Sequence, residues 1–197
     1  MEILGSANPK SAGLVTLAAL NPMPLNNYRT WPDSRRSNQE PEMDIQVRKA
    51  EAKDTPAIAE LLRSLGFFAH INAETPQTTQ ERVARHLAMC DADNSHSVFV
   101  AQNPAGEILG YGAVHWLPYL ILAGPEGYVS ELFVQESHRG QGIGSQLLEV
   151  MKAEARKRGC SRLMLINLRK RESYQRQFYR KQGWEEREGV ANFVYHL

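Results

Sequence analysis

The chain has 197 residues, with 23 Lys and Arg against 22 Asp and Glu, and 42% of its residues are hydrophobic. This length fits one domain with an appendage, and the hydrophobic share is typical of a globular chain rather than a wholly disordered one. No apolar run reaches the roughly 20 residues of a membrane-spanning helix, and a net charge of +1 gives no general attraction to nucleic acid.

Residues 1–42 differ in composition from the rest. Five of the ten prolines lie here among Asn and Ser, without a sustained hydrophobic period, which predicts a disordered or non-native extension. The apolar patch at residues 14–20 is a weak signal-peptide candidate, because its charged region and cleavage site are poor. Met43 is an alternative start, since a strand pattern follows it at once. We therefore place the domain at residues 43–197.

The first elements of this domain follow in a clear order. Ile45 and Val47 alternate with polar neighbours and predict a strand. Asp54, as a helix cap before Thr55-Pro56, predicts a helix that ends at Gly66. A second helix is predicted over residues 78–89.

A hairpin is predicted next, with strands at residues 97–102 and 108–116 joined by a turn at residues 103–106. After an apolar loop at residues 117–125, a further strand is predicted at residues 127–135. These strands are rich in residues that favour extended structure.

The last third alternates helices and short strands. A helix ends near Gly159, and the apolar run at residues 163–166 predicts a strand covered on both faces. A helix over residues 173–182 and two short strands, at residues 185–187 and 192–196, complete the chain. This order predicts an α/β fold with a mixed sheet and helices on its faces.

The cysteines and histidines indicate neither a disulfide framework nor a metal site. Cys90 and Cys160 could form one disulfide, but two cysteines favour reduced thiols in a cytoplasmic protein. The six histidines are scattered, without a pair at helical spacing beside a glutamate. We therefore predict no metal ion.

The most informative segment, residues 134–145, lies between a predicted strand and a predicted helix and contains three closely spaced glycines. Such glycines let backbone N–H groups turn toward a ligand, and the helix adds unpaired amides and the positive end of its dipole. A phosphate or pyrophosphate fits that geometry; the alternative is a tight turn without a ligand. Dinucleotide and P-loop motifs do not match, because Ser145 replaces a glycine of the first and the Gly-Lys pair of the second is absent.

Arg139-Gly140-Gln141-Gly142-Ile143-Gly144 resembles the Arg/Gln-x-x-Gly-x-Gly/Ala acetyl-CoA signature of the GNAT (GCN5-related) N-acetyltransferases. Three further segments resemble this family in the same order and spacing: residues 132–134, 159–165 and 178–184. The resemblance covers essentially residues 43–197. It implies the GNAT acyl-CoA N-acyltransferase fold, a central mixed β-sheet splayed between its fourth and fifth strands with helices on both faces.

The resemblance also implies acetyl-CoA as the co-substrate. Its pantetheine arm would pair with backbone groups of one strand, as an added strand would, and its pyrophosphate would rest on the glycine loop. Relatives often carry an Asn seven residues before their catalytic tyrosine, where Glu172 stands here, so Asn167 competes for that contact. The cofactor-binding residues implied are Leu132, Phe133, Val134, Arg139, Gly140, Gln141, Gly142, Ile143, Gly144, Ser145 and Asn167.

Acetyl transfer to an amine needs a neutral nucleophile, stabilisation of an oxyanion and a proton for the departing thiolate. The resemblance places Tyr179 where many relatives carry a general-acid tyrosine. A phenol with a pKa of about 10 can protonate a developing thiolate. The alternative for Tyr179 is a ring that packs against the sheet.

Glu131 and Glu126 are the candidates for the general base. Glu131 lies one residue before the pantetheine-binding stretch, and Glu126 lies at the entrance of the same strand. Either could take a proton from an ammonium group or attract it; we assign Glu131, with a solvated strand residue as the alternative. Tyr128 stands where some histone-modifying relatives carry their catalytic glutamate, which argues against copying their mechanism.

Basic residues crowd residues 152–187. Such a run usually forms a solvated face; the functional alternative is that Arg169, Lys170 and Arg171 approach the ribose 3′-phosphate of CoA. Nucleic acid is not supported, because no interleaved aromatics or reading module accompany the charge.

The resemblance implies an acetyl-CoA-dependent N-acetyltransferase, an acyltransferase of the EC 2.3.1 type. It would acetylate a primary amine of a small-molecule or peptide acceptor by direct attack in a ternary complex. The alternatives are a catalytically silent acetyl-CoA sensor and an interaction module. Residues 66–80 and the loop at residues 117–122 are expected to border the acceptor, and the apolar loop suggests a hydrophobic acceptor or a homodimer contact.

Overall fold

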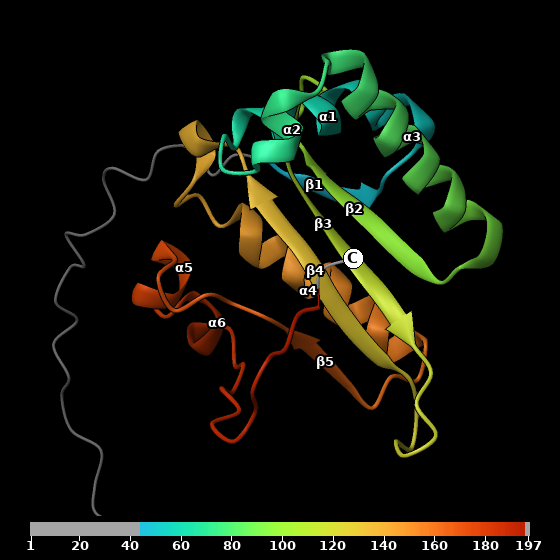
Figure 1. Cartoon of the computed structure of the whole chain (residues 1–197), viewed down its shortest axis with the longest axis vertical. Coiled ribbons are helices and arrows are strands. Elements are labelled where there is room, and N and C mark those ends of the chain that lie inside the picture. The colour runs from blue at the N-terminus through green and yellow to red at the C-terminus, as the bar shows by residue number, and fades with distance from the viewer. Residues whose placement is uncertain (1–43, 196–197) are drawn as a thin grey trace, which may run out of the picture. The chain divides into compact units, whose positions relative to one another are not determined.

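The computed structural model describes residues 44–195, so the extension expected at residues 1–42 lies outside them. Five strands form one sheet in chain order (Figure 1). The strands are β1 Gln46–Lys49, β2 His96–Gln102, β3 Ile108–Leu117, β4 Glu126–Val134 and β5 Arg162–Leu165. Neighbours from β1 to β4 pair antiparallel, and β4 and β5 pair parallel. The mixed sheet expected from the sequence is confirmed.

Helices cover both faces of this sheet (Figure 1). One face carries α1 and α3, and the other carries α4. The helices are α1 Thr55–Ser64, α2 Ala69–Ala73, α3 Pro76–Asp93, α4 Ile143–Lys157, α5 Glu172–Gln175 and α6 Phe178–Lys181, with 3-10 turns η1 Ala52–Asp54 and η2 Glu136–His138. None of the helices in the described part of the chain is long and apolar enough to cross a membrane.

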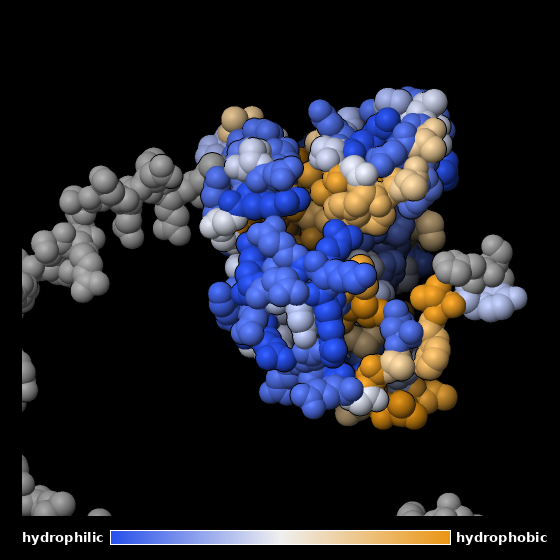
Figure 2. All heavy atoms as spheres, turned by 60° about the vertical axis from the view of Figure 1, so that its left-hand side comes forward, coloured by the Kyte–Doolittle hydropathy of each residue, from blue (hydrophilic) through white to orange (hydrophobic). Residues whose placement is uncertain are grey.

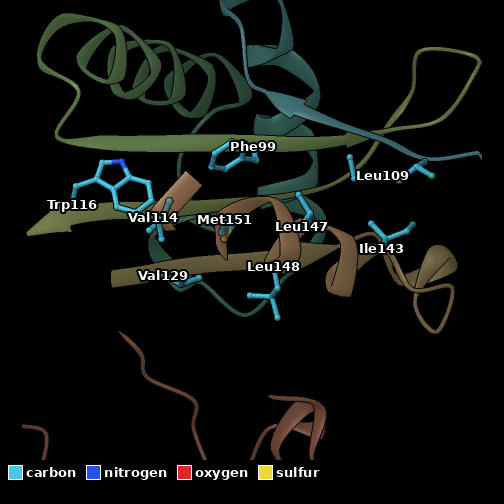
Figure 3. Close-up of a cluster of buried hydrophobic side chains, with 11 residues drawn as sticks. Phe99, Leu109, Val114, Trp116, Val129, Ile143, Leu147, Leu148 and Met151 are labelled. Carbon is cyan, nitrogen blue, oxygen red and sulfur yellow. The ribbon is translucent and has the colours of Figure 1, made fainter. Parts of the chain in front are cut away.

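The core between α4 and the sheet depends on the spacing of apolar residues along α4. Ile143, Leu147, Leu148 and Met151 recur at helical intervals and are buried against the sheet (Figure 3). The helix approaches the sheet closely at Gly112. A Cβ there would collide with the Met151 side chain and lie 3.1 Å from the Glu131 carbonyl oxygen.

The sheet opens between β4 and β5. Their parallel pairing runs from Glu126 opposite Arg162 to Val129 opposite Leu165, and β4 then continues to Val134. A bulge at the same place pairs Ala113 with Glu131 and Val114 with Val129, which leaves Ser130 without a partner on β3. The splay expected between these two strands is therefore present.

Two predicted helices have other bounds in the structure. The helix expected at residues 78–89 begins at Pro76, because the Thr75 hydroxyl caps it by accepting from the Thr78 amide at 3.1 Å. The helix expected at residues 173–182 is divided into α5 and α6, because Gln177 adopts a left-handed conformation with φ 56°. The short α2 was not predicted.

The strands expected after residue 184 are absent from the described part of the chain. Residues 185–195 form no ladder, and β5, expected to be covered centrally, is an edge strand. Glu186 instead accepts hydrogen bonds from Arg169, Tyr174 and Arg180, which hold this segment to α5 and α6. Extended propensity alone supplies no strand partner.

Asp54 does not cap α1 through its side chain as expected. Its carboxylate accepts from both Arg48 Nη atoms, at 2.7 and 2.8 Å, and from the Glu51 amide at 2.8 Å. Burial raises the pKa of this carboxyl, but these donors together outweigh burial and hold the pKa below its ordinary value. Asp54 therefore ties β1 to the start of α1.

Both cysteines are free thiols. Burial raises the pKa of the Cys90 thiol to about 11, and burial also raises that of Cys160. Within residues 44–195, no group of three or more His, Cys, Asp or Glu side chains is arranged to hold a metal ion.

Candidate active site

A pocket of about 560 Å³ opens where β4 and β5 part. Residues 129–134 of β4 line one side, and residues 165–168, which follow from β5, line the other. The glycine loop, which we define as residues 139–145, and Tyr179 of α6 complete the lining of this pocket. Figure 2 shows a hollow in this part of the molecule, with hydrophobic surface at its floor between hydrophilic surroundings.

The glycine loop leads directly into α4. Gly140 and Gly142 have φ of +83° and +80°, a region that favours glycine, and Gly142 is the N-cap of the helix. The first-turn amides of Ser145 and Gln146 donate to the Gly142 carbonyl. The backbone amides from Gly140 to Gly144 have no acceptor among residues 44–195. This loop therefore presents consecutive free N–H groups at a helix N-terminus, an arrangement suited to an anion.

The expected cofactor-binding residues collect around this pocket. Leu132, Phe133 and Val134 lie on the part of β4 beyond its pairing with β5, and Asn167 lines the opposite side. Of the residues expected in the loop, only Gln141 lies outside the lining. The Asn167 side chain accepts a hydrogen bond from Ser173 at 3.1 Å, which fixes its orientation.

Tyr179 lines the same pocket and is largely buried. Burial raises the pKa of its phenol, with the Arg176 charge opposing the shift, so the group is protonated at neutral pH. Its ring contacts Phe178 and Trp184, with centroids 5.0 and 6.1 Å away. Packing of the Tyr179 ring and donation of a proton by its hydroxyl are therefore compatible.

Glu131 lines both this pocket and a second one. The buried Tyr111 hydroxyl donates to its Oε2 atom at 2.6 Å. Burial, followed by the Glu131 charge, raises the pKa of Tyr111 well above its ordinary value, so Tyr111 remains a donor. This contact orients the carboxylate and leaves acceptor capacity for another partner.

The second pocket, of about 270 Å³, lies between α1, α3 and the sheet. Its lining is mostly apolar, with polar groups from Arg82, Arg85, His86, Tyr111 and Glu131. This pocket was not predicted from the sequence. A signal was available, because Arg82, Arg85 and His86 recur at helical spacing beside Val83 and Leu87.

Other expected contributors lie elsewhere. Glu126, the second candidate base, is 1% exposed, forms an ion pair with Arg162 and lines neither pocket. Arg169 pairs with Glu186 at 2.8 Å. Lys170 and the apolar loop at residues 117–122 line neither pocket.

Residues 66–80 and the basic run both contribute to the lining of the first pocket. Arg171 lies over the Phe67 ring, 4.0 Å from its centroid, and both line the pocket. Phe68, His138 and Arg176 also line it. Phe67 and Phe68 belong to the segment expected to border the acceptor, and Arg171 is one of the three basic residues expected near CoA, whereas His138 and Arg176 were not singled out from the sequence.

Comparisons with known proteins agree with this geometry. Residues 55–184 match the family model described as Acetyltransferase (GNAT) family. An L-methionine sulfoximine/L-methionine sulfone acetyltransferase of Pseudomonas paraeruginosa is 32% identical over 120 residues, 59% of this chain and 67% of the relative. A thialysine N-epsilon-acetyltransferase of Mus musculus is 26% identical over 155 residues, 75% of this chain and 89% of the relative.

Solved structures share the fold. The crystal structure of a transcriptional regulator from Bacillus halodurans C-125 superposes with a TM-score of 0.66 at 24% sequence identity, over 78% of this chain and 99% of the other. At this identity the likeness concerns the fold alone.

Proposed function

This chain belongs to the GNAT family of acetyltransferases, and from that membership we propose that it acetylates the primary amine of a small molecule by direct attack on acetyl-CoA. Acetyl-CoA is the co-substrate that the family implies. The observation that carries the proposal is the position of Glu131, which lines both the pocket beside the glycine loop and the second pocket.

We assign acetyl-CoA to the first pocket and the acceptor to the second. Pantetheine lies along the free part of β4 at Leu132, Phe133 and Val134, and the pyrophosphate rests on the free amides of the glycine loop. Arg139 stands beside these amides in the same lining. The acceptor occupies the second pocket, so that its amine meets the thioester at Glu131.

The reaction removes two protons from the acceptor nitrogen, one before the attack and one as the amide forms, and supplies one proton to the sulfur. Glu131 accepts a proton from the acceptor's ammonium group, and the neutral amine attacks the thioester carbonyl. The tetrahedral intermediate collapses with cleavage of the carbon–sulfur bond, and its positively charged nitrogen loses the second proton, which returns through solvent to the Tyr179 oxygen. Tyr179 protonates the departing thiolate, which burial of its phenol favours by keeping it protonated. Both substrates are bound together, without an acetylated enzyme.

A small acceptor is supported by the second pocket and by the relatives. At about 270 Å³, this pocket is near the lower end of ligand-site volumes, about 300 to 1,000 Å³. The two relatives are named for acetylation of methionine sulfone or sulfoximine and of thialysine, all amino acids.

The test is an assay of CoA release with a panel of amines, combined with calorimetric binding of acetyl-CoA. Glu131→Gln should lower kcat about 100-fold or more with most amines, while acetyl-CoA still binds. Glu149→Gln, at an exposed residue of α4 outside both pockets, is the matched control and should retain full activity. Absence of acetyl-CoA binding would refute the proposal, whereas binding without turnover of any amine would favour a sensor.

A further inference from the structure

Resting on the proposed function, we propose that the acceptor carries an anionic group besides its amine, and that Arg85 of α3 binds it in the second pocket. Arg82 and Arg85 are the fixed positive charges of that pocket and Glu131 is its negative charge. A ligand with one ammonium and one carboxylate or phosphonate group complements this arrangement.

The two arginines differ in how far the protein already uses them. Arg82 forms an ion pair with Glu74, and Glu74 also accepts from the Thr79 hydroxyl at 2.9 Å. Thr79 is buried and in turn contacts Arg63 at 3.3 Å. Arg82 is therefore held and largely neutralised by a network that links α1, α3 and the residue after α2.

Arg85 has no such partner. Within residues 44–195 it forms no ion pair and no side-chain hydrogen bond, although it lies one helical turn from Arg82 and lines the same pocket. A guanidinium group is suited to paired contacts with the two oxygens of a carboxylate or phosphonate. Within the described residues the pocket thus has an exposed cation, Arg85, that forms no ion pair with Glu131.

The rest of the lining favours a ligand with an apolar portion. Ile58, Leu62, Val83 and Met89 contribute hydrocarbon surface, and His86 also lines the pocket. Burial, followed by the charge of His96, lowers the pKa of His86, so it adds little positive charge at neutral pH. Binding of the ligand's anionic group therefore depends on arginine rather than on histidine.

The test uses acceptor pairs that differ only in the anionic group: L-methionine with L-methioninamide, L-lysine with cadaverine, and 3-aminopropylphosphonate with propylamine. Steady-state kinetics and calorimetric binding to the CoA-loaded protein are measured for each pair. The anionic member should be preferred at least about 10-fold in both measurements.

Arg85→Gln should raise KM for the preferred anionic acceptor about 10- to 100-fold. The kcat, the KM for acetyl-CoA and the KM for the neutral partner should stay within about twofold. Arg85→Glu should reverse the preference within the lysine and cadaverine pair. Arg156→Gln, at an exposed arginine of α4 outside both pockets, is the control and should change nothing.

Turnover without preference for anionic acceptors, or an equal loss for both members in Arg85→Gln, would overturn this inference and leave the proposed function standing. Selective binding of anionic acceptors that depends on Arg85, without turnover, would support the inference and refute the proposed function. Neither binding nor turnover of the anionic members would refute the inference.

Discussion

Tyr179, the proposed proton donor, is partly buried against the core. Burial raises the pKa of its phenol, so the hydroxyl stays protonated through the neutral range and can serve as a donor. Tyr179→Phe should lower kcat about 100-fold and leave the acetyl-CoA dissociation constant nearly unchanged. Stopped-flow and steady-state measurements of CoA release test this. Tyr119→Phe, in the exposed loop that lines neither pocket, is the control. An unchanged kcat in Tyr179→Phe would assign Tyr179 to packing alone.

Asp54 contributes at the residue scale to stability rather than to chemistry. Asp54→Asn should lower the free energy of unfolding by about 2 to 3 kcal/mol, because the mostly buried Arg48 loses its charged partner. Lys53→Gln, which removes an exposed pair with Glu51, should cost less than about 1 kcal/mol. Urea unfolding measures both, and equal costs would contradict the assignment.

The contribution of Asp54 to the free energy of unfolding should also depend on pH. The folded-state pKa of Asp54 lies below its ordinary value, so the unfolded chain binds the proton first as the pH falls. Its contribution is therefore complete above about pH 4 and is lost as the pH decreases through the folded-state pKa. Asp54→Asn should remove this part of the acid dependence.

At the scale of elements, the distance between α4 and the sheet is set at Gly112. Gly112→Val should destabilise the protein by about 2 to 3 kcal/mol, since a side chain there meets Met151 and the Glu131 carbonyl. If the collision with Met151 is the cause, the cost should be smaller in a Met151→Ala background. A double-mutant cycle in urea measures this coupling. Strict additivity would place the strain at the backbone of Glu131 instead.

Local sequence signals are enough to predict some helix ends but not others. Gly66 and Gly159 predicted helix ends correctly, because each adopts a positive φ after the helix. Gln177 gave no such signal, although it adopts the same conformation. Its break allows Phe178 to approach Gly144, where a Cβ would lie 3.2 Å from Phe178 Cζ. Tertiary packing against α4 therefore decides this boundary.

At the scale of the whole molecule, three histidines, one each from α3, β2 and β3, lie together where α3 packs on the sheet. The ring centroids of His86 and His96 lie 4.4 Å apart, and those of His96 and His115 lie 5.2 Å apart. Burial, followed by the charge of His96, lowers the pKa of both His86 and His115. The folded protein therefore holds these two rings neutral where the unfolded chain would bind protons.

Stability should accordingly decrease as the pH falls below about 6.5, the ordinary histidine value. Urea unfolding at pH 7.5 and 5.5 measures the decrease. The double variant His86→Gln/His115→Gln should show a smaller difference between the two pH values, and His70→Gln, at an exposed histidine, should not. An undiminished difference in the double variant would assign the pH dependence to other groups.

The two pockets differ in how far the sequence could predict them. The glycine loop, the strand before it and Tyr179 lie in short local motifs, so the loop could be recognised from its own residues and the resemblance to the GNAT family linked the strand and Tyr179 to it. The second pocket depends on α3 packing over β2 and β3, which brings Arg85 toward a strand more than forty residues later. The position of Glu126 could not be predicted either. Its burial against Arg162 results from the pairing of β4 with β5, which the spacing of residues in the sequence does not reveal.

The two cysteines, both partly buried, also determine the background of an assay that detects thiols. With a pKa of about 11, only about one Cys90 side chain in a thousand is a reactive thiolate at pH 8, and burial makes Cys160 less reactive as well. A disulfide reagent that detects free thiols should therefore record the CoA that leaves the enzyme against a low background from the enzyme itself. The same property should protect both cysteines from air oxidation during purification.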